Sequence, residues 1–182
     1  MGNRSSRGGD WELGLWSPDR VTDQSHFDWT SGEQVGFTLV WDAAAGRADF
    51  SLGNGQGARD VSADEPDPIG SLVIRLASYR DGSVGRLDSL TLNGVALDGR
   101  LHASGGTASL LLEDATLRTG FSLSGRATFS WRPGDTPRGS QSAFQIKAFH
   151  EAPPVMAVPT PTAGSLALVG LGGLLFRRGT RG

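Results

Sequence analysis

Cysteine is absent from this chain of 182 residues, and lysine occurs once, at Lys147. Without a thiol, the chain can have no disulfide framework, no thiolate nucleophile and no cysteine-bound zinc. Neither sign of charge dominates, because 17 basic residues stand against 19 acidic ones and the formal net charge is −2. A nucleic-acid groove would need a basic stripe, so we do not expect nucleic acid as a partner.

Large aliphatic and aromatic residues are also in short supply. Leu, Ile, Val and Phe make up about 23% of the chain, just above the roughly 20% below which disorder is expected. Glycine is frequent, with 27 residues, but glycine and proline together stay below the roughly 25–30% that marks low-complexity chains. We therefore expect one folded domain of ordinary size accompanied by additional segments.

Alternation of apolar and polar residues is the dominant pattern of the body. It is clearest from Leu117 to Trp131, where Leu, Phe, Ala and Trp occupy most odd positions and Ser, Arg and Thr most even ones. A period of two is typical of antiparallel strands that bury one face. Gly120 and Gly125 interrupt this long stretch and predict a kink or a bulge in it.

Shorter alternating stretches recur about every ten residues. They lie at 11–15, 35–41, 48–52, 72–76, 90–97, 110–112 and 144–148, and Asn93-Gly94 predicts a hairpin turn. This rhythm predicts an all-β protein, with an antiparallel β-sandwich or jelly-roll-like domain over residues 10–150 and a closed barrel as the alternative. Residues 1–9 are expected to be disordered, and Gly53–Pro68 and Pro133–Ser140 to be exposed loops.

The composition changes after Glu151. Residues 151–162 are rich in proline and predict a stiff, extended linker. Residues 163–182 open with an uncharged apolar run that ends at Phe176. A packed core helix is the ordinary interpretation of so short a run, since 14 helical residues span about 21 Å and a hydrocarbon core is roughly 30 Å thick.

Three features nevertheless favour a membrane helix. The run lies near the C-terminus, it follows a proline-rich spacer, and it ends in arginines that can snorkel and that prefer the cytoplasmic side. Tilt or local thinning of the bilayer compensates for the short length. The residues assigned to this helix are Leu166, Leu168, Val169, Leu171, Leu174, Leu175 and Phe176, and the basic cluster is Arg177, Arg178 and Arg181.

The order of these segments resembles the PEP-CTERM sorting signal of exported bacterial proteins. The residues that carry the resemblance are Val158, Pro159, Thr160 and Pro161, then Leu166–Phe176, then Arg177-Arg178. Thr160 stands where the motif usually has Glu. Short patterns in the body, at 29–32, 37–39, 90–94 and 144–147, are similar to those of the β-rich domains that precede such tails.

The resemblance implies processing of the tail by an exosortase-type membrane enzyme after export. It implies a protein of the cell envelope or extracellular space, with the body outside and the arginines cytoplasmic before processing. Residues 1–20 contain no apolar core of a signal peptide. We therefore expect such a signal to be encoded upstream of Met1.

No motif for catalysis stands out. His26, His102 and His150 lie far apart and have no metal-ligand spacing, and the chain has neither a nucleophile elbow nor a phosphate-binding loop. We therefore predict a non-enzymatic protein with no cofactor and no catalytic residue, and keep a jelly-roll hydrolase as a less favoured alternative. The predicted loop Gly53–Pro68 is rich in carboxylates, and we interpret it as solvated. The alternative is a structural Ca²⁺ bound near Asp60, Asp64 and Asp67.

Tryptophan supports a third hypothesis, a carbohydrate-binding module. The chain has five Trp residues, and an exposed indole can stack on the apolar face of a sugar ring. Trp41 and Trp131 fall on apolar strand faces, which predicts core packing. Trp16 and Trp29 are the candidate ligand-binding residues, and a surface polysaccharide is the corresponding partner.

Overall fold

The computed structural model describes residues 2–5, 10–17, 20–53, 56–61, 68–137 and 141–150, and describes side chains only within 27–53, 68–137 and 141–150. Antiparallel strands supply almost all of the regular structure in this part of the chain, which confirms the predicted all-β class. The strands are β1 (Gly2–Ser5), β2 (Asp10–Ser17), β3 (Arg20–Asp28), β4 (Gln34–Asp42), β5 (Arg47–Leu52), β6 (Gln56–Val61), β7 (Ser71–Ser78), β8 (Val84–Leu92), β9 (Val95–Ala96), β10 (Leu101–Ala103), β11 (Gly106–Glu113), β12 (Phe121–Ser130) and β13 (Ser142–Phe149). A single 3-10 helix, η1 (Ala115–Arg118), is described among them.

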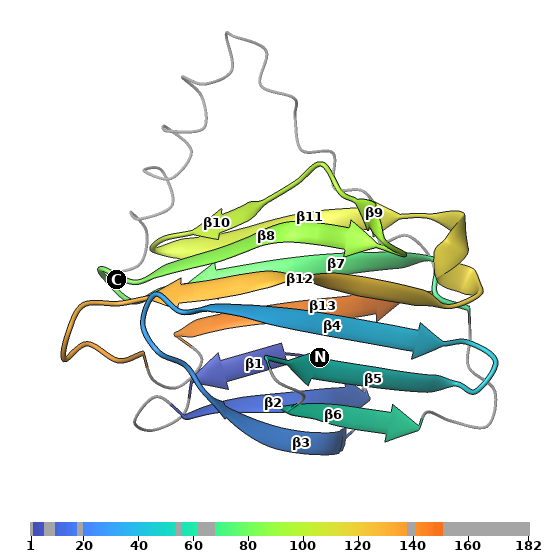
Figure 1. The fold of residues 1–182 in the computed structure, drawn as a ribbon, viewed down its shortest axis with the longest axis horizontal. Helices are drawn as coiled ribbons and strands as arrows, with labels where there is room; N and C mark the ends of the chain where they lie inside the picture. Colours follow the sequence, from blue (N-terminus) through green and yellow to red (C-terminus); the bar gives the residue numbers. More distant parts are fainter. Residues whose placement is uncertain are drawn as a thin grey trace, which may run out of the picture.

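The strands form two antiparallel sheets. The first, called sheet A, has the order β11-β7-β13-β1-β2-β3, and the second, called sheet B, has the order β10-β8-β12-β4-β5-β6, with β9 added to β8. At one side of the molecule β10 lies beside β11, and at the other side β3 lies beside β6 (Figure 1). The outer strands of one sheet therefore approach those of the other at both sides of the core.

The core lies between the sheets, because alternate residues of each strand point inward. On β4 the inward residues are Val35, Phe37, Leu39 and Trp41, and each is buried. The ring of Phe144 on β13 of sheet A lies 5.1 Å from that of Phe37 on sheet B, measured between centroids. Such aromatic contacts add to the area-proportional gain of burying apolar side chains and hold the two sheets together.

The long alternating stretch proves to be a helix followed by a strand. Residues 115–118 form η1, where Asp114 accepts hydrogen bonds from the backbone N–H and the hydroxyl of Thr116, and Leu117 is buried in the core. Gly120, with φ of +117°, separates η1 from β12. The strand predicted from residue 117 therefore begins at Phe121, and the expected bulge lies at Gly125, where the pairing with β8 shifts register.

Several strands had no clear signal in the sequence. The predicted loop Gly53–Pro68 contains β6, which pairs with β5, and the segment expected to be disordered, 1–9, contains β1, which pairs with both β2 and β13. β3 and β10 were also missed. β3, β6 and β10 are outer strands of their sheets, and an outer strand can be held mainly by backbone hydrogen bonds without a strongly apolar face.

Candidate ligand-binding groove

Small and hydroxylated side chains hollow the outer face of sheet B. Thr91 of β8 pairs with Ser124 of β12, Ser124 pairs with Thr38 of β4, and Thr38 pairs with Ser51 of β5. These four residues form one row across the sheet, here called the hydroxyl row. Their neighbours along each strand point into the core, so the row faces away from it.

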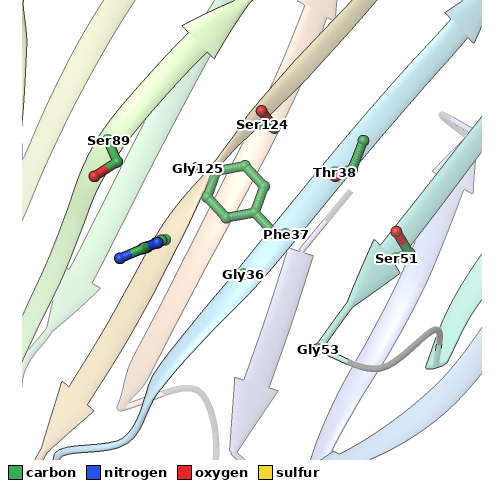
Figure 2. Close-up of a pocket in the computed structure, with 9 residues that line it drawn as sticks. Gly36, Phe37, Thr38, Ser51, Gly53, Ser89, Ser124 and Gly125 are labelled. Atoms are coloured by element: carbon green, nitrogen blue, oxygen red, sulfur yellow. The ribbon is translucent and has the colours of Figure 1, made fainter.

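A second row lies next to the hydroxyl row, and two of its positions, Gly36 and Gly53, carry no side chain. Arg126 of β12 pairs with Gly36 of β4, and the carbonyl of Gly36 accepts a hydrogen bond of 2.8 Å from the N–H of Gly53. The missing side chains leave a shallow groove of about 410 Å³ between the rows (Figure 2). The groove is lined by Gly36, Phe37, Thr38, Ser51, Gly53, Ser89, Ser124, Gly125 and Arg126.

Two of the glycines that line the groove, Gly125 and Gly36, differ in whether the fold requires glycine at their position. A Cβ at Gly125 would lie 2.7 Å from Cδ2 of Leu90 and 2.9 Å from Cε1 of Phe37, so the packing of the core requires glycine there. A Cβ at Gly36 would have no atom within 4 Å, and Gly36 has no positive φ. Glycine within a strand costs roughly 0.5–1 kcal/mol relative to Ala, and neither backbone conformation nor packing at Gly36 accounts for that cost.

A bulge shapes one end of the groove. Between the pairs Thr91–Ser124 and Asp88–Arg126, β8 contributes Ser89 and Leu90 where β12 contributes only Gly125. Ser89 adopts a positive φ of 53°, as the first residue of such bulges often does. The bulge places Ser89 at the mouth of the groove (Figure 2).

Polar side chains at this end form a hydrogen-bonded chain. Arg126 donates from Nη1 to Oε1 of Gln34 at 3.1 Å, and Gln34 donates from Nε2 to Oδ1 of Asp88 at 3.3 Å. Ser89 donates to the same Asp88 oxygen at 3.3 Å. Separately from this chain, the hydroxyls of Thr91 and Ser124 lie 2.7 Å apart. The groove therefore presents hydroxyls and a guanidinium that Gln34 holds by a hydrogen bond.

The structure corrects one of the two tryptophan assignments. Trp29 is 4% exposed and packs edge-on against Phe27 and Phe129, each with ring centroids 5.2 Å away. Its indole lies in the core because Trp29 follows β3 directly and turns inward there, so it has no free face for a sugar. Trp16 belongs to β2, but its side chain lies outside the described set. Trp41 is buried and Trp131 packs against the core, as predicted.

The other predicted sites lie outside the described residues. They are the sorting motif at 158–161, the apolar segment 166–176, the arginine cluster, and the carboxylates proposed for Ca²⁺, of which only the backbone of Asp60 in β6 is described. Where side chains are described, no three His, Asp or Glu residues gather as a metal site would require. No helix in the described ranges has the length and apolarity needed to cross a membrane.

The groove was missed by sequence reasoning because strands distant in the sequence contribute one to three residues each. Gly36 was the available signal, since it occupies an outward position in the middle of a strongly alternating strand. Comparison with known proteins adds no assignment, since no family model and no curated protein matches the chain.

Proposed function

We propose that this chain is an exported, non-enzymatic protein of the cell envelope or extracellular matrix, sorted by its C-terminal segment. The observation that carries the proposal is the order of the proline motif at 158–161, the apolar run at 166–176 and the pair Arg177-Arg178. An apolar helix followed by arginines inserts with the arginines on the cytoplasmic side. The β-rich body, which precedes it, is then carried on the outside.

The body, as a jelly-roll-like β-sandwich with its own core, is suited to a position outside the membrane. The last strand among the described residues, β13, ends at Phe149, two positions before the proline-rich residues 151–162 begin. A linker of this length in the polyproline conformation spans on the order of 37 Å, at about 3.1 Å per residue. That length would hold the body clear of the membrane surface and leave the outer faces of both sheets accessible.

The chemistry of the groove supports a role without catalysis. The described residues that line it include neither histidine nor a carboxylate, whereas general acid–base catalysis needs a titratable group beside the reacting bond. The nearby Asp88 already accepts hydrogen bonds from Gln34 and Ser89. The groove is therefore better suited to binding a polar molecule than to cleaving one.

The test is the intact mass of the chain recovered separately from the membrane, medium and cytoplasm of cells that produce it. We expect a species cut between residues 158 and 164 in the envelope or the medium. The double variant Pro159→Ala/Pro161→Ala should accumulate uncut. The matched double variant Pro153→Ala/Pro154→Ala, which changes the same linker outside the motif, should be cut normally. Recovery of the uncut wild-type chain from the cytoplasm would refute the proposal and indicate that residues 166–176 pack as a helix of the domain.

A further inference from the structure

The groove on sheet B is elongated across the strands. It extends from Ser89 on β8 over β12 and β4 to Gly53 after β5, which corresponds to three interstrand spacings of about 4.8 Å, or roughly 14 Å. It is open to solvent rather than enclosed, so a chain molecule can enter from the side. This shape fits a segment of a polymer better than a small, fully enclosed ligand.

Gly36 leaves room for a ligand over the backbone of β4. Its strand position is open, its backbone is ordinary, and a Cβ would meet nothing. Glycine at such a place in a strand is typical of sites where another molecule approaches the backbone closely. Any larger residue at position 36 would fill the middle of the groove.

The hydroxyl row defines the kind of polymer. Ser124, Thr38 and Ser51 of this row line the groove, and each carries a hydroxyl that can donate and accept hydrogen bonds. The Ser124 hydroxyl shares one hydrogen bond with that of Thr91. Phe37, the one aromatic residue among the lining residues, is 3% exposed and so offers no stacking surface. A surface of hydroxyls complements a chain that carries many hydroxyls of its own.

Two arginines add a preference for negative charge. Arg126 lines the groove, and Arg86 occupies the diagonal position on β8, two register pairs further along, where side chains of neighbouring strands are about 7–8 Å apart. Both are exposed, and neither forms an ion pair with the residues described here. Arg126 pairs in register with Asp88 and donates one hydrogen bond to Gln34, and the other N–H groups of its guanidinium can bind a carboxylate.

We propose that this groove binds an acidic polysaccharide, with a sugar carboxylate at Arg126 and the chain lying along the hydroxyl row across β8, β12, β4 and β5. The biological meaning of this inference rests on the proposed export, which would bring the groove to such a polymer. The binding itself depends only on the body and can be measured independently of the tail.

The experiment is calorimetric titration of the purified full-length chain, in detergent, with an oligogalacturonate of defined length. Two further probes are its fully methyl-esterified form, which keeps the hydroxyls and loses the charge, and an oligoglutamate with the same number of carboxylates. We expect binding of the oligogalacturonate and at least tenfold weaker binding of both comparison probes. Absence of binding, or equal affinity for the acid and either comparison probe, would overturn the inference.

Variants locate the site. Arg126→Gln should weaken binding of the oligogalacturonate at least tenfold, and Gly36→Thr should abolish it by filling the groove. The matched controls are Arg118→Gln on η1, which removes the same charge elsewhere, and Gly106→Thr on β11, where a Cβ also meets nothing within 4 Å. If the controls weaken binding as much as the groove variants do, the assignment to this groove is wrong.

The two proposals fail separately. A chain that stays uncut in the cytoplasm yet binds the acid oligomer through Arg126 would refute the proposed function and support the groove. A chain that is cut and exported yet shows no affinity for the acid oligomer would support the proposed function and refute the groove.

Discussion

The two central glycines of the groove should respond to substitution with opposite signs. Gly36 has an open environment and an ordinary φ, so Gly36→Thr removes the cost of a glycine in a strand and adds a β-branched residue. We expect the free energy of unfolding to rise by about 0.5–1.5 kcal/mol. For a domain of this size that corresponds to a rise in Tm of roughly 2–5 °C.

Gly125 has the opposite environment. A Cβ there would approach Cδ2 of Leu90 to 2.7 Å and Cε1 of Phe37 to 2.9 Å, and both side chains are buried. Overpacking of this kind typically costs about 1–3 kcal/mol, so Gly125→Ala should lower the free energy of unfolding by that amount. The contrast is informative because the two glycines lie on neighbouring, paired strands.

Urea unfolding followed by tryptophan fluorescence measures both changes, with Gly106→Thr as the control for adding a threonine to an open strand position. An equal m-value is required, so that a shift in midpoint reports stability. The reasoning is refuted if Gly36→Thr lowers the free energy of unfolding by more than about 1 kcal/mol or if Gly125→Ala is neutral. Gain of stability together with loss of ligand at position 36 would be the pattern expected when glycine is retained for binding.

Two further predictions concern polar groups outside the groove. The hydrogen bonds from the hydroxyl and the backbone N–H of Thr116 lower the pKa of Asp114 below its ordinary value of 3.8. A lowered pKa adds stability that is present above the ordinary value and is lost as the pH falls through the folded-state pKa. Urea titrations at successive pH values should therefore show the stability difference between wild type and Asp114→Asn shrinking over that acid range. The hydroxyl of Ser142 is buried and has no hydrogen-bond partner among the described residues. Ser142→Ala should therefore be neutral or raise the free energy of unfolding by about 1 kcal/mol. Ser83→Ala should lower the free energy of unfolding, because the Ser83 hydroxyl hydrogen-bonds the Ser78 hydroxyl and the Arg80 carbonyl. Equal losses at both serines, or a constant difference for Asp114→Asn at all pH values, would contradict these assignments.

The sequence predicts strands well where one face is buried and poorly where neither face is strongly apolar. β4 and β12 alternate because their inward residues fill the core. β3 and β6 are outer strands whose backbone pairing lies on one side of the strand, and their sequences carry little period-two signal. The helix η1 was not predicted, because Leu117 occupies an odd position like the apolar residues of β12 and so extends their alternation. In the structure its side chain enters the core from a helical turn.

The groove could not be predicted for a different reason. Its residues become neighbours through the register of four strands, and the pairings Thr91–Ser124 and Ser124–Thr38 connect residues far apart in the sequence. Serine, threonine and glycine are also the residues that sequence reasoning assigns to solvated faces and turns. The prediction of an exposed Trp29 was wrong for the converse reason, since the sequence does not show on which side of the chain the core lies once β3 has ended.

The groove and the tail become mutually useful if the ligand is a polymer. An open, hydroxyl-lined groove leaves much of its ligand in water, and no aromatic ring in its lining is available for stacking, so we expect one site to bind one segment weakly. A polysaccharide repeats the same segment many times, and a sorting tail concentrates many copies of the body on one surface. Under these conditions, second and later contacts are intramolecular and overall avidity can exceed the single-site affinity by about 10²–10⁴.

The expected signature is weak calorimetric binding of short oligomers by the chain in solution and strong retention of long polymers by the same chain immobilised at high density, with both lost in Arg126→Gln. Equal affinity for short and long probes at high density would show that the groove does not act through repeated contacts.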